Sequence, residues 1–230
     1  MNIFCEDLIR QIKKRGADLV GIANLSALHE LSTGIAVAVA VPPNVIRSIH
    51  NGPTMEYYDA YNRINACLND IVTFGAQYLT DNGYTAYAQT TEIVEEYGNY
   101  RTTLPHKTVA TRAGLGWIGK CALLVTEDFG SAIRISSLVT NADLPCGEPI
   151  DDSRCGDCDN CRISCPGDAV IGELWRVGVD RDSLFDPVKC KKAARNLAAE
   201  KIDREITLCG KCIEVCPYTQ RYLSKSAHIV

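Results

Sequence analysis

Residues 155–166 read Cys-Gly-Asp-Cys-Asp-Asn-Cys-Arg-Ile-Ser-Cys-Pro, and residues 209–217 read Cys-Gly-Lys-Cys-Ile-Glu-Val-Cys-Pro. Both runs contain cysteines separated by two residues, and both end in Cys-Pro after a gap of three. Thiolates are soft, anionic ligands that suit iron, and two intervening residues let neighbouring thiolates reach one cluster. The pattern predicts two four-iron, four-sulfur ([4Fe-4S]) clusters and therefore one-electron transfer. The predicted ligands are Cys155, Cys158, Cys161, Cys165, Cys190, Cys209, Cys212 and Cys216.

The spacing also predicts how the ligands divide between the clusters. In two-cluster ferredoxins the fourth cysteine of such a run ligates the other cluster. The same exchange would give the first cluster Cys155, Cys158, Cys161 and Cys216, and the second cluster Cys165, Cys190, Cys209 and Cys212. Structural zinc, which also uses Cys-x2-Cys pairs, is the alternative. A three-cysteine run that ends in Cys-Pro and is followed by a second such run is unusual for zinc.

The composition is that of a soluble globular protein. Of 230 residues 46% are hydrophobic and 23% charged, and the net charge is -4. This charge argues against nucleic acids, which attract proteins through Lys and Arg, and no apolar run approaches the roughly 18 residues of a membrane span. The first residues show no signal-peptide pattern, so we expect a cytoplasmic protein. In a reducing cytoplasm the 12 cysteines are expected to serve metal or redox chemistry.

Apolar residues at three- and four-residue spacing predict helices, and short apolar runs predict strands. The expected elements are helices over 2–15, 54–80 and 107–113, and strands over 19–23, 35–41, 84–89, 122–126 and 133–140. The last two strands are expected to form a hairpin, which favours an α+β fold over a parallel doubly wound sheet. Cys, Gly and Asp dominate after Pro145, so we expect one domain over 1–145 and another over 146–230.

A glycine motif, Gly-Leu-Gly-Trp-Ile-Gly, occupies residues 114–119. A dinucleotide-binding motif of this form needs a strand before the glycines and a helix after them, so that pyrophosphate meets a helix N-terminus. Here a predicted helix precedes the motif and a predicted strand follows it, which argues against NAD. Glycines still let the backbone approach a large flat cofactor closely.

The stretch from His106 to Lys120, followed by Gly130 and the two cysteine runs, resembles epoxyqueuosine reductases, relatives of the corrinoid-dependent reductive dehalogenases. The resemblance extends from about residue 57 to the C-terminus, is strongest over 106–217 and includes Cys190. It implies a nitroreductase-like α/β domain that binds cobalamin. A ferredoxin-like domain with two [4Fe-4S] clusters would follow and deliver electrons to cobalt.

The resemblance implies that the glycine segment binds the corrinoid. Its candidate cofactor-binding residues are Arg112, Gly114, Gly116, Trp117, Gly119 and Lys120. The glycines would allow close approach to the macrocycle, the indole would offer apolar area, and the two cations would pair with carboxamide or phosphate groups. The alternative is a tight helix-to-strand turn with the indole in the core.

Epoxyqueuosine reductases carry a catalytic aspartate on the strand before this segment, where residues 87–92 here read Tyr-Ala-Gln-Thr-Thr-Glu. Candidate proton donors, each with a solvated or packing role as its alternative, are Tyr87, Glu92, Glu95 and Tyr97. The family also has a C-terminal helical-repeat region that binds transfer RNA. Because this sequence ends at Val230, we expect that transfer RNA is not a partner. The net charge and the lack of a long apolar run argue in the same way against DNA and a membrane.

These features together predict a cobalamin-dependent reductase of a small molecule, supplied by a low-potential donor such as ferredoxin or flavodoxin. Two alternatives remain open. One is an electron-transfer module that reduces a partner corrinoid protein, and the other is an FMN-binding reductase on the same scaffold. Cys5 and Cys67 fit buried helix positions, whereas Cys121 and Cys146 have no assigned role.

Overall fold

The computed structural model describes residues 3–98 and 100–226. The chain packs into two compact units that alternate along the sequence. The first unit runs to residue 40 and resumes over 63–116 and 134–151, and the second covers 41–62, 117–133 and the chain from 152 onward. Packing therefore does not follow chain order. The two units are defined by packing, whereas a domain is a segment that folds or evolves separately. The division into domains 1–145 and 146–230 therefore stays a prediction.

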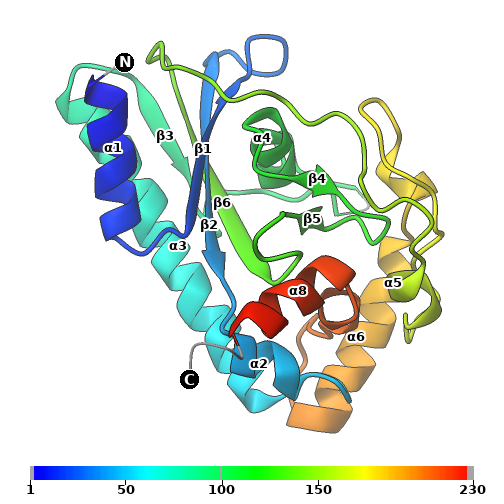
Figure 1. Cartoon of the computed structure of the whole chain (residues 1–230). Helices are drawn as coiled ribbons and strands as arrows, with labels where there is room; N and C mark the ends of the chain where they lie inside the picture. The colour runs from blue at the N-terminus through cyan, green and yellow to red at the C-terminus, as the bar shows by residue number, and fades with distance from the viewer. Residues whose placement is uncertain (1–2, 99, 227–230) are drawn as a thin grey trace. The chain divides into compact units, whose positions relative to one another are not determined.

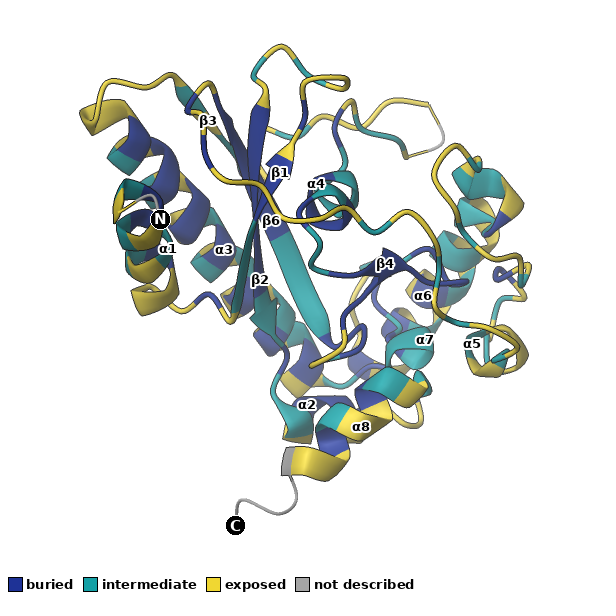
Figure 2. Ribbon diagram, turned by 45° about the horizontal axis from the view of Figure 1, so that its top comes forward, coloured by how far each residue is buried: buried dark blue, intermediate teal, exposed yellow. Residues whose placement is uncertain are grey.

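The first unit is built on a four-stranded sheet of order β1-β2-β6-β3. Its strands are β1 (Leu19–Asn24), β2 (Thr33–Ala40), β3 (Ala86–Gln89) and β6 (Ile133–Thr140). β1 pairs with β2 in antiparallel register, and β3 pairs in the same sense with β6. Most of β2 is buried, as Figure 2 shows by its dark colour, which explains its almost wholly apolar sequence.

Helices cover both faces of this sheet: α1 (Ile3–Lys14) and α3 (Met55–Asp81) lie on one side and α4 (His106–Arg112) on the other (Figure 1). Gly75 brings α3 close to the sheet, because a Cβ there would lie 2.6 Å from Leu138 Cδ2. Gly34 does the same for α4, since its Cβ would lie 2.7 Å from Val109 Cγ1. Glycine thus appears in these elements where two backbones approach closely.

The second unit consists mainly of short helices. They are α2 (Pro43–Ser48), α5 (Asn160–Ile163), α6 (Pro187–Ile202), α7 (Lys211–Glu214) and α8 (Pro217–Ser226), with a 3₁₀ turn over Arg181–Ser183. A two-stranded sheet pairs β4 (Trp117–Ile118) with β5 (Leu124–Val125). The longest of these helices, α6, begins where the Asp186 carboxylate accepts hydrogen bonds from the backbone N–H groups of Val188 and Lys189.

The mixed helix and strand fold is confirmed, but one detail of the expected topology is wrong. The predicted hairpin between 122–126 and 133–140 does not form. The first of these segments is reduced to β5 and pairs with β4, while the second becomes β6 and pairs with β3. A bridge between Thr126 and Gly130 closes a tight loop in the second unit, and β6 enters the sheet of the first. In the part of the chain that the structure describes, no helix has the length and apolarity needed to cross a membrane.

Candidate metal centre

One cavity of the second unit collects the cysteines that the sequence assigns to the first cluster. Its cysteines are Cys121, Cys155, Cys158, Cys161, Cys212 and Cys216, and the rest of its wall is Gly119, Lys120, Val125, Pro217 and Tyr218. The turns of chain around the short helices α5 and α7 and the start of α8 therefore bring both Cys-Pro runs to one place. All four predicted ligands of the first cluster lie here.

A second group contains Cys165, Cys190 and Cys209. Burial, followed by the charges of Cys165 and Cys209, raises the pKa of the Cys190 thiol to about 11. Burial also raises the pKa of Cys209, and Cys165 adds to the effect. Three of the four predicted ligands of the second cluster are therefore neighbours. The fourth, Cys212, lies in the wall of the first cavity.

Backbone N–H groups point at several of these sulfurs. The Ala169 N–H donates to Cys165 Sγ over an N···S distance of 3.3 Å. The N–H groups of Tyr218 and Thr219 bond to Cys216, where they oppose the rise in pKa that burial causes. Such bonds favour the thiolate over the thiol, and the thiolate is the form that binds iron.

Ser131 provides a further sign that Cys216 is placed to act as a thiolate. Its hydroxyl oxygen is buried and has no partner of ordinary hydrogen-bond geometry among the described residues. The same hydroxyl nevertheless lies beside the Cys216 sulfur, where it favours the charged form. A buried hydroxyl without a partner is costly, and a cluster-bound thiolate at Cys216 would accept a hydrogen bond from it.

The cysteine arrangement fits two iron–sulfur clusters, because the sulfurs form two groups. Within the described ranges, no three His, Cys, Asp or Glu side chains are placed to hold a single metal ion. The fit rests on the two groups of sulfurs and on the N–H and O–H groups that face them. Cluster assembly must displace thiol protons, since the ligands bind iron as thiolates.

Lys120, a candidate corrinoid-binding residue, lies in the wall of the first cavity. Its side chain is buried, and Nζ lies 2.9 Å from Asp159 Oδ1. Hydrogen bonds from Lys120 and then Arg162 hold the pKa of the Asp159 carboxyl below its usual value. Gly119 lies in the same wall, because a Cβ there would be 3.6 Å from Cys155 Sγ and 2.9 Å from Val125 Cγ2.

The other candidate corrinoid-binding residues make contacts within their own units. Trp117 is fully buried in T-shaped contact with Tyr218, and its indole N–H finds no partner in the described chain. Arg112 pairs with Asp151 in the first unit. Gly114 has a φ of 73°, and a Cβ there would lie 2.5 Å from Glu148 O. Close packing thus accounts for Gly114, and Gly116 is buried. The corrinoid role of this segment stays a prediction.

The candidate proton donors are solvent-exposed. Tyr87, on β3, exposes 62% of its surface and Tyr97 exposes 58%, and Glu92 and Glu95 are exposed as well. The structure gives none of these four residues the buried surroundings that would adapt a side chain to proton transfer. Their catalytic role stays a prediction.

Sequence reasoning gave no role to His106, which begins α4. Its Nδ1 lies 2.8 Å from Ser137 Oγ, and that hydroxyl donates to Gln89 Oε1 over 2.8 Å. Burial, with a smaller contribution from the charge of Arg134, lowers the pKa of His106 to about 4. The imidazole is therefore neutral at physiological pH and belongs to a polar chain on the sheet. Its one signal in the sequence was its place at the start of the stretch that resembles epoxyqueuosine reductases.

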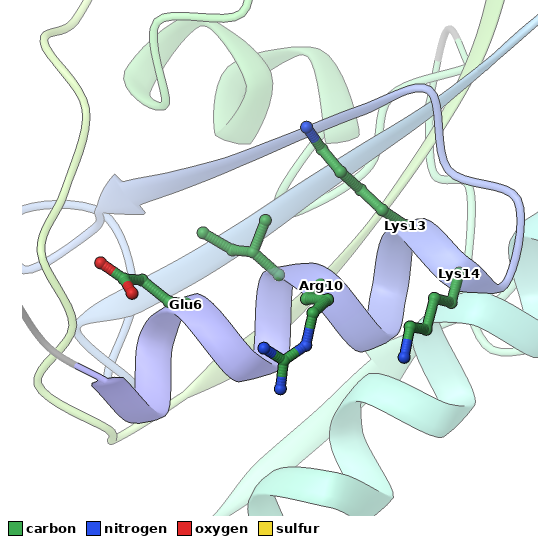
Figure 3. A pocket seen from close by; sticks show the side chains of 5 residues that line it. Glu6, Arg10, Lys13 and Lys14 are labelled. Carbon is green, nitrogen blue, oxygen red and sulfur yellow. The ribbon is translucent and has the colours of Figure 1, made fainter.

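A separate hollow lies on the surface of α1, between the side chains of Glu6, Ile9, Arg10, Lys13 and Lys14 (Figure 3). It contains none of the candidate residues. Its polar side chains extend from one exposed helical face, which is the ordinary arrangement of a solvated surface helix.

The comparisons with known proteins agree with the cysteine pattern. Residues 154–219 match a family described as a 4Fe-4S double cluster binding domain. Epoxyqueuosine reductase from Lactococcus garvieae is 34% identical over 140 residues, which are 61% of this chain and 36% of that protein. The epoxyqueuosine reductase of Synechocystis sp. is 31% identical over 120 residues, 52% of this chain and 41% of its own length.

Two groups of solved structures share the fold. The structure described as suggesting a mechanism for B12-dependent dehalogenation, a reductive dehalogenase, matches with a TM-score of 0.71 and 17% identity over 97% of this chain and 34% of its own. An epoxyqueuosine reductase solved with a tRNA stem loop matches with a TM-score of 0.61 and 19% identity over 94% and 65%. The resemblance stated from the sequence is confirmed. The chain spans little more than a third of the length of the curated relatives it matches.

Proposed function

We propose that this chain is an iron–sulfur oxidoreductase that passes single electrons through two [4Fe-4S] clusters to a corrinoid, and so reduces a small molecule. The observation that carries the proposal is the cysteine set: all eight predicted ligands lie within the matched double-cluster segment. The grouping of seven of them supports the predicted division, whereas Cys212 lies with the first group instead of the second.

The cysteine groups support electron transfer by themselves. Sulfurs of the first group come from both Cys-Pro runs, so one cluster would tie α5 to the start of α8. The second group joins the end of the first run to α6 and the start of α7. Each cluster would therefore cross-link segments far apart in the sequence, which holds the two centres at a constant separation.

The corrinoid part of the proposal rests on the relatives. A reductive dehalogenase of the same fold is described in connection with B12-dependent dehalogenation. A bound corrinoid would supply a cobalt centre that accepts electrons and performs the difficult chemistry. Of this chain's residues, Arg112 and Gly116 lie in the first unit and within the stretch 106–217 in which the resemblance is strongest.

A second candidate, an electron-transfer module that reduces a partner protein, is favoured by the exposed candidate donors. Residues 87–92 contain no aspartate, and Tyr87 and Glu92 lie on the surface. An acceptor that docks from solution would need no buried proton donor. The expectation against transfer RNA is also weakened, because one matched epoxyqueuosine reductase was solved with a tRNA stem loop.

Anaerobic reconstitution followed by titration with cofactors tests the proposal. We expect about eight irons and eight sulfides per chain, and a shift in the cobalamin spectrum to the base-off form. FMN or a tRNA stem loop that binds in place of cobalamin would support another reading. Tightly bound zinc without sulfide would contradict the cluster assignment.

Two variants test the location of the corrinoid. Gly116→Val adds bulk at a buried position, and Arg112→Gln removes a cation with little change in volume. Arg112→Gln should weaken cobalamin binding by about tenfold or more, since a lost charged hydrogen bond costs about 1.5–3 kcal/mol. Gly116→Val should abolish the spectral shift, because the added side chain would block close approach of the macrocycle. Both should leave the iron content unchanged. Gly98→Val is the matched control, because a Cβ there meets no described atom within 4 Å. Equal binding by all three variants would place the corrinoid elsewhere.

A further inference from the structure

The first cavity contains more thiols than one cluster needs. Two [4Fe-4S] clusters require eight thiolates, and the two Cys-Pro runs with Cys190 supply them. Cys121 is a ninth thiol, outside both runs, and it lines the cavity together with the first-cluster cysteines. Its place in the sequence, after the glycine motif, gives no reason for a sulfur.

The turn that carries Cys121 is held by backbone hydrogen bonds. The Gly119 N–H donates to Leu123 O over 2.8 Å, and the Ala122 N–H donates to Gly119 O over 2.8 Å. Ala122 takes a left-handed φ of 60°, which closes the turn between β4 and β5. Cys121 therefore projects from a constrained backbone, and only 6% of its surface is exposed.

Cys121 lies against cysteines from both runs. Hydrogen bonds join its sulfur to those of Cys161 and Cys212, and in the first of them Cys161 is the donor. A Cys161 that binds iron as a thiolate has no proton to donate, so Cys121 would then become the donor. A Cβ at Gly119 would lie 3.6 Å from Cys155 Sγ and 3.7 Å from Cys121 Sγ. Gly119 is therefore next to both sulfurs, and it has no side chain that would occupy the cavity. The thiol thus faces the first group of ligands rather than the solvent.

We propose that Cys121 is not a ligand but a hydrogen-bond donor that faces the first cluster and its ligand sulfurs, and that it raises the cluster's reduction potential. The proposal rests on the two clusters of the proposed function. Reduction adds negative charge to the cluster and its sulfurs, so a donor stabilises the reduced state more than the oxidised one. Burial strengthens the effect, since water does not compete for the bond.

A thiol can perform this role because it combines a weak donor with small, apolar bulk. The neighbouring wall residue Lys120 is already paired with Asp159, and its charge is thereby partly neutralised. Cys121 differs from Lys120 because its S–H group is an uncharged donor in the same wall. It would tune the first cluster without changing its charge and without closing the cavity.

Redox titration of the reconstituted full chain tests the inference. Iron and sulfide are counted for the wild type, Cys121→Ala and Cys121→Ser, and each cluster's midpoint potential is followed by paramagnetic resonance. Cys121→Ala should keep both clusters and shift one potential to a more negative value. Cys121→Ser, whose hydroxyl also donates, should return that potential toward the wild-type value. Cys5→Ala, which removes a buried thiol from α1, is the control and should shift neither.

Three results would overturn the inference, and they can be told apart. Unchanged potentials in Cys121→Ala would mean that the thiol only fills space. Loss of about four irons from Cys121→Ala would mean that it is a ligand. Failure of the wild-type chain itself to assemble any cluster would contradict the proposed function, and this inference with it.

Discussion

Gly130 packs closely against the first turn of α8. Replacing it with alanine should displace that turn and cause loss of the first cluster. A Cβ at this position would lie 2.2 Å from Thr219 N, 2.5 Å from Thr219 Oγ1 and 2.7 Å from Thr219 Cα. Most of these atoms are backbone, so α8 itself must move. Thr219 Oγ1 also accepts a hydrogen bond from the Ser131 N–H over 3.2 Å, and this bond would be lost.

The expected cost of Gly130→Ala combines three effects. Forced overpacking costs about 1–3 kcal/mol, a left-handed alanine costs about 1 kcal/mol, and the lost hydrogen bond costs about 1 kcal/mol. The free energy of unfolding should therefore fall by about 3–5 kcal/mol. With a denaturant slope of about 3 kcal/mol per molar urea, the unfolding midpoint should fall by more than about 1 M.

The control is Gly178→Ala, also in the second unit. Gly178 has a φ of 90°, and a Cβ there meets nothing within 4 Å in the described ranges. This angle lies beyond the small left-handed region that alanine tolerates, whereas the φ of 58° at Gly130 lies within it. The control therefore carries at least as much backbone strain but no collision, and it should cost about 1 kcal/mol.

The assay combines anaerobic urea denaturation with iron analysis and paramagnetic resonance. Thr219 donates to the Cys216 sulfur, so moving the start of α8 should remove a ligand from the first cluster and spare the second. Gly130→Ala should then retain about four irons, and Gly178→Ala about eight. Equal midpoints for the two variants, or full iron content in Gly130→Ala, would refute the argument from close packing.

Two further predictions concern the second cluster and the buried histidine. The closeness of Cys165 to Cys190 indicates that Cys165 serves the second cluster. Cys165→Ala and Cys190→Ala should then alter the same resonance signal. A Cys165→Ala spectrum that matches that of Cys155→Ala instead would mean that each run holds its own cluster. His106 has its pKa lowered from 6.5 to about 4, so its contribution to stability is present above pH 6.5 and is lost as pH falls toward 4. The free energy of unfolding should fall by about 3 kcal/mol in the wild type and should not show this fall in His106→Gln. Urea denaturation at a series of pH values from 7.5 to about 4 measures both proteins. Parallel plots of stability against pH for the two proteins would contradict the assignment.

Local pattern was enough to predict several parts of this molecule. The long helix expected over 54–80 is found at Met55–Asp81, because its three- and four-residue apolar period needs only one buried face. The double-cluster segment was found from cysteine spacing and is confirmed by the family match over 154–219. Trp117 shows the limit: the sequence left both a core position and cofactor contact open, and the structure adds that the side chain is fully buried while its contact with a cofactor stays a prediction.

The sequence by itself therefore determined the kind of cofactor, since ligand spacing is a local property: a thiolate two residues from the next can reach the same cluster whatever surrounds it. Only the tertiary structure decided which strand pairs with β6 and which residues face the cysteines. Strand partners are set by burial and register between segments far apart in the chain, so 133–140 pairs with β3 instead of its neighbour in sequence. The same non-local packing brings Cys121 against Cys161 and Cys212, a contact that no spacing rule predicts.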